Sequence, residues 1–158
     1  MTKRILIAVI CLISINAKAQ SLTGNEVMDA HINGIEALKT TIIENWEKPY
    51  KQMGIEVESD IYYSKKSRSI VYRTEVFSKK VFTRFTTSSL SAMEKTFWKD
   101  FRVSLIKQDP SGGILNEFIE AVKETGINYR WVFVYKDKSI VEVTDSDELI
   151  YYLRASSK

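Results

Sequence analysis

The stretch INYRWVFVYKDKSIVEV, residues 127–143, constrains the fold more than any other part of the chain. Its aromatic residues stand at every second position: Tyr129, Trp131, Phe133 and Tyr135. Side chains two residues apart on a β-strand point to the same face. The spacing therefore predicts a strand at 127–135 with one aromatic face. The charged turn and the Val-rich segment after it predict a second strand at 139–144.

The four rings have two interpretations, as core or as a binding surface. One face of the sheet must be buried under helices, and burying a large apolar side chain contributes about 1.5–3 kcal/mol. Trp131 and Phe133, at the centre of the stripe, are therefore expected in the core. Tyr129 and Tyr135 lie at the strand ends, where their hydroxyls can reach water, and are better candidates for contact with a ligand. The full set of candidate ligand-binding residues is Tyr129, Tyr135, Tyr62, Tyr72 and Trp131.

The N-terminal segment has the parts of a secretory signal peptide. Two basic residues precede an apolar run at 5–15, and the small-x-small pattern Ala17-Lys18-Ala19 follows it. The run is too short for an ordinary transmembrane helix, which needs about 20 apolar residues. We expect cleavage of residues 1–19, export to the periplasm or the extracellular space, and no stable membrane insertion afterwards. A signal anchor that stays attached is the alternative.

Cleavage would change both the charge and the redox chemistry of the chain. It would remove three of the 23 basic residues and none of the 20 acidic ones, which leaves a net charge near zero. Such a balance gives no electrostatic reason to expect nucleic-acid binding. The only cysteine, Cys11, would leave with the signal peptide, so the mature domain must be stabilised by a packed core rather than by disulfides.

Hydrophobic periodicity and breaker residues predict the remaining elements. The first helical stripe begins at Met28 and has a candidate break at Asn33-Gly34, so its secure part spans 35–48. The other expected helices span 89–107, 114–126 and 145–153, and the expected strands span 56–64 and 69–77. The segment VFTRF, residues 81–85, is expected to be an edge strand or a continuation of the strand before it. Ser91 and Glu94 have the spacing of a capping box at a helix start.

These elements predict a single α+β domain over residues 20–158. Four or five mostly antiparallel strands are expected, with three or four helices packed on one face. Both halves read helix, hairpin, helix when Gly54 is aligned with Gly126. This similarity is consistent with a helix-hairpin-helix duplication, or with the general likeness of any two helix-hairpin units.

The residues that most often carry catalysis are scarce. His31 is the only histidine, and no cysteine would remain after cleavage, which excludes Cys–His catalysis and zinc sites built from these ligands. We expect His31 to be solvated or to cap a helix, and we expect no cofactor. Two glutamate pairs at i, i+3 could act as acid and base, but lysines beside them favour solvated helix faces. The pairs are Glu44 with Glu47, and Glu117 with Glu120.

Two loops carry weaker signals. Ser111-Gly112-Gly113 precedes a helix and could offer N–H groups to an anion, although a plain linker is the simpler interpretation. Lys65, Lys66 and Arg68 form a basic run that fits either a solvated hairpin turn or a partner-binding patch.

The segment INYRWVFVYKDKSIVEVTDSDEL resembles the C-terminal part of small exported proteins of Bacteroidota and related bacteria, whose functions are unknown. The resemblance covers the last third of the chain. It implies export and the helix-to-hairpin layout, and it carries over no functional residues.

The sequence therefore favours an exported, non-enzymatic binding module. Its expected ligand is a protein partner, a glycan or an apolar small molecule. The alternatives are a structural or assembly component of the envelope, and a hydrolase that uses carboxylates.

Overall fold

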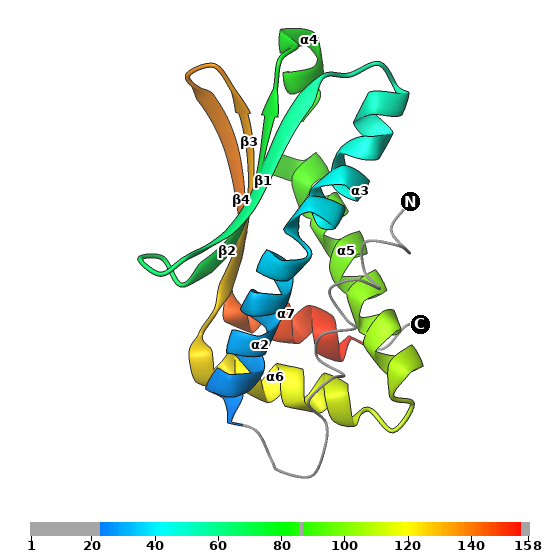
Figure 1. Cartoon of the computed structure of the whole chain (residues 1–158), viewed down its shortest axis with the longest axis vertical. Coiled ribbons are helices and arrows are strands. Elements are labelled where there is room, and N and C mark those ends of the chain that lie inside the picture. Colours follow the sequence, from blue (N-terminus) through cyan, green and yellow to red (C-terminus); the bar gives the residue numbers. More distant parts are fainter. Residues whose placement is uncertain (1–22, 86, 156–158) are drawn as a thin grey trace.

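A computed structural model describes residues 23–85 and 87–155, and the predicted signal peptide lies outside these residues (Figure 1). The helices are α2 (Gly24–Ala37), α3 (Lys39–Gln52), α4 (Lys79–Phe82), α5 (Thr87–Gln108), α6 (Gly113–Thr125) and α7 (Ser146–Arg154). The strands are β1 (Val57–Ser64), β2 (Ser69–Val76), β3 (Asn128–Tyr135) and β4 (Lys138–Thr144). Within the described ranges, none of the helices combines the length and the apolar character that crossing a membrane requires.

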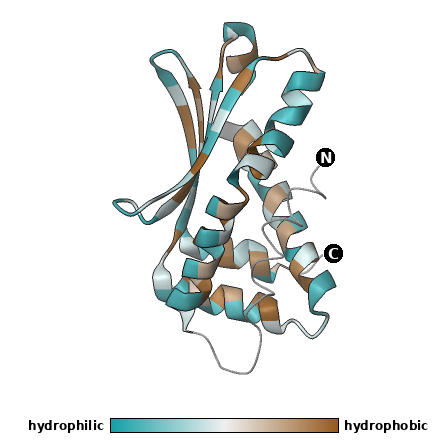
Figure 2. Cartoon of the chain, in the orientation of Figure 1, coloured by the Kyte–Doolittle hydropathy of each residue, from teal (hydrophilic) through white to brown (hydrophobic). Residues whose placement is uncertain are grey.

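The four strands form one sheet in the order β1-β2-β3-β4. The hairpins β1–β2 and β3–β4 are antiparallel, and the two hairpins join through the parallel pair β2–β3. The helices pack on one face of the sheet (Figure 1). The predicted α+β domain with a mostly antiparallel sheet under a helical layer is thus confirmed. Figure 2 shows apolar residues along the strands and hydrophilic residues at both hairpin turns.

The aromatic stripe of β3 lies on the covered face. Trp131 and Phe133 are buried, as predicted, and Trp131 stacks on Tyr72 with ring centroids 4.4 Å apart. Tyr129 is also buried, at 1 % exposed, so the expectation that its hydroxyl reaches water is wrong. The reason is α2, which covers this end of the strand and places His31 Nε2 2.8 Å from the Tyr129 hydroxyl.

His31 is the second correction, because it is 2 % exposed rather than solvated or capping. The helix that carries it starts earlier than predicted. Thr23 and Glu26 form a capping box that begins α2 at Gly24, and Leu38 then separates α2 from α3. The stripe from Met28 is therefore divided into two helices, and the break lies at Leu38 rather than at Asn33-Gly34.

Two further predictions fail near the middle of the chain. The segment 81–85 is not a strand, because Ser78 caps the short helix α4 by accepting a hydrogen bond from Val81 N. The helix expected from residue 89 begins at Thr87. Ser91 and Glu94 therefore lie inside α5 and form no capping box, and Glu94 is buried.

The two helix-hairpin units do not superimpose. Viewed from the helical side, with β1 and β3 turned to run in the same direction, β2 and β4 lie on opposite sides of them, because β3 runs parallel to β2. The units therefore have opposite handedness, and no rotation relates them. This arrangement favours a general likeness of helix-hairpin units over copies with one fold.

Candidate functional site

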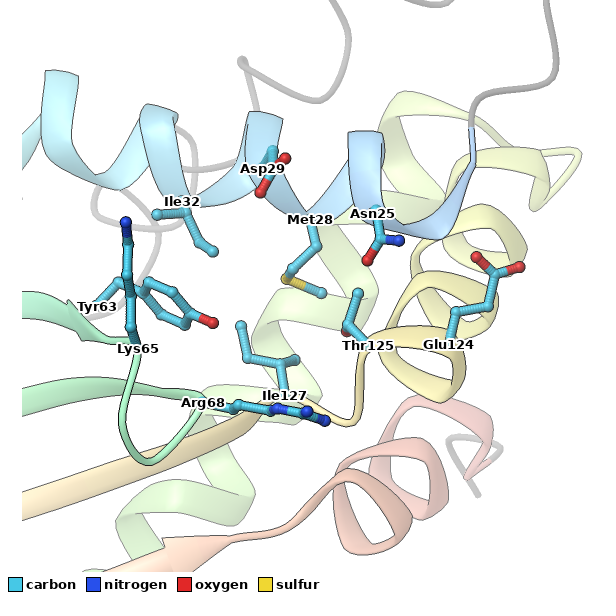
Figure 3. A pocket seen from close by; sticks show the side chains of 10 residues that line it. All are labelled: Asn25, Met28, Asp29, Ile32, Tyr63, Lys65, Arg68, Glu124, Thr125 and Ile127. Atoms are coloured by element: carbon cyan, nitrogen blue, oxygen red, sulfur yellow. The ribbon is translucent and has the colours of Figure 1, made fainter.

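A pocket of about 400 Å³ lies where α2 passes the β1–β2 turn and the junction of α6 with β3 (Figure 3). Its apolar part consists of Met28, Ile32 and Ile127, which also pack in or against the core. Figure 3 shows the Tyr63 hydroxyl directed into the pocket from β1. The pocket therefore has a floor fixed by the core and a hydrogen-bonding group at its side.

Charged side chains of opposite sign stand on different walls of the pocket. Lys65 and Arg68 come from the β1–β2 turn, whereas Asp29 belongs to α2 and Glu124 to α6 (Figure 3). Within residues 23–85 and 87–155, no ion pair involves Lys65, Arg68 or Asp29. These charges are thus available to a molecule that enters the pocket.

Glu124 has a structural bond as well as a place at the rim. One of its carboxylate oxygens accepts a hydrogen bond from Gly24 N at 2.7 Å, which ties the end of α6 to the start of α2. A Cβ at Gly24 would lie 2.2 Å from the same oxygen. A side chain at position 24 would therefore displace Glu124 and alter this wall of the pocket.

Arg68 is held in an unusual backbone conformation. Its φ is 47°, in the left-handed region that glycine adopts without steric cost. The carbonyl of Arg68 accepts a hydrogen bond from Asn128 N at 2.9 Å, so the turn is fixed to the start of β3. Non-glycine residues in this region cost of order 1 kcal/mol or more, and such strain is concentrated at functional sites.

The residues predicted to bind a ligand do not form this pocket. Tyr72, Trp131 and Tyr129 lie in the core, and Tyr135 is half-buried against α4, with its ring 5.7 Å from that of Phe82. Tyr62 is 37 % exposed on the opposite face of the sheet. The structure brings Tyr72 and Trp131 together, but as stacked core rings.

The predicted carboxylate pairs do not form a shared centre either. Glu47 is buried, contrary to the expectation of a solvated face. It accepts a hydrogen bond from Ser59 N at 2.7 Å and pairs with Lys51 at 2.7 Å. Glu44, Glu117 and Glu120 are exposed, and Glu120 pairs with its predicted neighbour Lys123.

The loop at 111–113 supplies its own anion. The Asp109 carboxylate accepts hydrogen bonds from Ser111 N and Ile114 N, both at 3.0 Å. The hydrogen bond from the Ser111 hydroxyl, followed by these bonds from the backbone, lowers the pKa of Asp109. The position expected for a bound anion is therefore occupied by Asp109, which supports the interpretation of this segment as a connecting loop.

Glu94 is a second unusual feature that the sequence did not reveal. Its side chain, on α5, is 1 % exposed, and its oxygens have no hydrogen-bond partner among the described residues. Burial raises the pKa of Glu94 to about 7, and the charges of Glu148 on α7 and Glu142 on β4 contribute. Within the described ranges no group of histidine, cysteine or acidic side chains could hold a metal ion, so Glu94 is a buried acid without a metal-binding role.

Comparison with protein families, with curated proteins and with solved structures found no match to this chain. The pocket geometry is therefore the main guide to function. Its lining residues offer charges, hydrogen-bonding groups and an apolar floor, which are the features of a recognition site.

Proposed function

We propose that the protein is an exported binding module that holds a small zwitterionic ligand in the pocket between α2 and the β1–β2 turn. The observation that carries this proposal is the separation of charge across the pocket. Lys65 and Arg68 stand on the turn, and Asp29 and Glu124 stand on the helices, above an apolar floor.

Each wall suits one end of such a ligand. The planar guanidinium of Arg68 can donate two parallel hydrogen bonds to a carboxylate, and Lys65 adds a second positive charge. Asp29 can accept hydrogen bonds from an ammonium group. The Tyr63 hydroxyl can bind a polar group at the centre of the ligand, while Met28 contacts its apolar portion.

The size of the pocket and the predicted export of the protein support this assignment. A volume of about 400 Å³ lies within the range of small-molecule sites. A short peptide or a free amino acid carries both charges and fits the chemistry of the walls. An exported protein, as the N-terminal pattern indicates, would meet such molecules outside the cytoplasm.

The test is calorimetric titration with unmodified dipeptides, using alanyl-leucine as the first probe. The N-acetylated and the C-amidated forms of the same dipeptide each lack one charge. We expect binding of the unmodified form and at least tenfold weaker binding of both blocked forms, because a hydrogen bond to a charged group contributes about 1.5–3 kcal/mol.

Variants then locate the binding site. Arg68→Ala and Asp29→Asn should each weaken binding about tenfold or more. Lys66→Ala is the matched control, because Lys66 lies on the same turn and is exposed but does not line the pocket. The proposal fails if a panel of dipeptides and amino acids does not bind, or if binding is indifferent to both pocket variants.

A component of an envelope assembly is the second candidate function. The specific observation in its favour is the exposed edge of β4, which does not depend on the pocket.

A further inference from the structure

The two edge strands of the sheet, β1 and β4, differ in whether their outward backbone groups have hydrogen-bond partners. On β1, side chains accept hydrogen bonds from two of these groups. Ser59 N donates to the Glu47 carboxylate at 2.7 Å, and Ile61 N donates to the side chain of Asp60 at 2.9 Å. Lys39 pairs with Asp60 at 2.6 Å from the start of α3. Carboxylates thus occupy the two central outward N–H groups of β1, which hinders another strand from pairing there.

The outer edge of β4 is open, as the hydrogen-bond alternation shows. Asn128 N donates to Arg68 O, so Asn128 and every second residue after it point their backbone groups toward β2. The intervening residues of β3 bond to β4, which leaves the N–H and C=O groups of Ser139, Val141 and Val143 directed outward. No hydrogen bond to these groups exists within 23–85 and 87–155.

Two of the three residues with outward backbone groups have apolar, exposed side chains. Val141 is 45 % exposed and Val143 is 40 % exposed, on the face of the sheet that the helices do not cover. An exposed apolar strand with free backbone groups is a template for another strand. The outward N–H and C=O groups of β4 therefore fit a partner segment that is itself an extended strand.

The sequence of β4 is complementary to itself. When two copies pair antiparallel about a two-fold axis at Val141, Val141 faces its counterpart and Ser139 faces Val143 of the other copy. On the covered face Glu142 then faces Ile140 of the other copy and lies diagonal to Lys138 on one side and to Glu142 on the other. Each dimer therefore contains two diagonals of opposite charge and one between the two Glu142 side chains, so the attractive pairs outnumber the repulsive one.

An excess of negative charge near β4 adds to this complementarity. Glu142 lies close enough to Glu94 on α5 and to Glu148 on α7 for the three charges to interact, and Lys95 is the cation that acts on this group. Lys138 from a second copy would place another positive charge beside the cluster. We infer that the partner of the β4 edge is a second copy of this chain, and that two copies form a continuous eight-stranded sheet through antiparallel β4–β4 pairing. This inference is independent of the pocket.

Analytical ultracentrifugation of the full chain over a range of concentrations tests the pairing. We expect a monomer–dimer equilibrium that Val141→Pro abolishes, because proline removes an outward N–H while the bonds of β4 to β3 remain. Val143→Lys is a second variant that places a charge on the same edge. Tyr62→Lys is the matched control, since Tyr62 is exposed on the same sheet face but lies on β1.

Charge reversal provides a readout that loss of folding cannot imitate. Lys138→Glu should weaken the dimer about five- to tenfold by placing like charges diagonally across the axis. The double variant Lys138→Glu with Glu142→Lys should restore it. A monomer at every concentration overturns the inference, as does a dimer that survives both edge variants or one that the double variant fails to restore.

Discussion

Two buried groups, Glu94 and His31, are expected to give opposite dependences of stability on pH. Burial raises the pKa of Glu94 from about 4.5 to about 7, so its contribution is fully present below pH 4.5 and is lost as the pH rises through 7. Burial lowers the pKa of His31 from 6.5 to about 4, so its contribution is present above pH 6.5 and is lost as the pH falls toward 4.

The magnitudes follow from these pKa values. One pKa unit corresponds to about 1.4 kcal/mol, so between pH 5 and pH 8 the contribution of Glu94 falls by about 2.5 kcal/mol. Over the same interval the contribution of His31 rises by about 2 kcal/mol. These two terms nearly cancel in the wild-type protein, and the effect of Glu94 is therefore visible only in a variant.

Glu94→Gln isolates the effect because glutamine has nearly the same shape and carries no charge. Urea unfolding should show the variant about 1 kcal/mol more stable than the wild type at pH 5 and about 3 kcal/mol more stable at pH 8, so that its advantage grows by about 2.5 kcal/mol over this interval. Glu117→Gln is the matched control, since Glu117 is exposed and should change stability by less than about 0.5 kcal/mol at either pH. An equal stability of Glu94→Gln and wild type at pH 8 would refute the buried charge.

The remaining predictions concern single positions. Arg68→Gly should keep or raise the free energy of unfolding, by up to about 1 kcal/mol, and should lose ligand binding. Lys136→Gly, at φ 54° in the other hairpin turn, is the control and should have a similar free energy of unfolding while keeping ligand binding. Equal ligand titration curves for the two variants would contradict the role of Arg68. Trp131→Ala should cost about 3–5 kcal/mol in thermal or urea unfolding, and Trp131→Phe much less, because it also removes the unpartnered indole N–H. Glu47→Ala should cost about 1–3 kcal/mol by leaving Ser59 N without its acceptor, whereas Glu44→Ala, at an exposed position, should be nearly neutral in the same assay.

Local patterns were sufficient for the elements whose faces are defined by their own residues. The alternation of β3 predicted its aromatic face, because a strand with a period of two has only one way to bury large rings. Asp145 was expected near a helix start, and it caps α7 by accepting a hydrogen bond from Glu148 N at 2.8 Å. In these segments the local sequence and the tertiary packing require the same conformation.

Prediction failed where the outcome depends on a distant segment. The spacing of Ser91 and Glu94 fits a capping box, yet α5 starts earlier and turns Glu94 toward β4 and α7. His31 looks like a surface residue until α2 is known to lie over Tyr129, which is 98 residues away in the chain. No local pattern contains that information, because both burials arise from contacts between elements.

The pocket and the β4 edge also depend on contacts between distant segments, which explains why the sequence did not predict them. In the sequence, Lys65 and Arg68 read as a solvated turn because the acids that face them come from α2 and α6. The edge of β4 is recognisable only by contrast with β1, whose outward N–H groups at Ser59 and Ile61 donate to Glu47 and Asp60. The chain thus binds two N–H groups of one edge with carboxylates that stabilise the monomer, and leaves free backbone groups and two exposed valines on the other edge. A monomer gains nothing from exposed valines on a free strand, so the difference between the edges is best explained by pairing at β4.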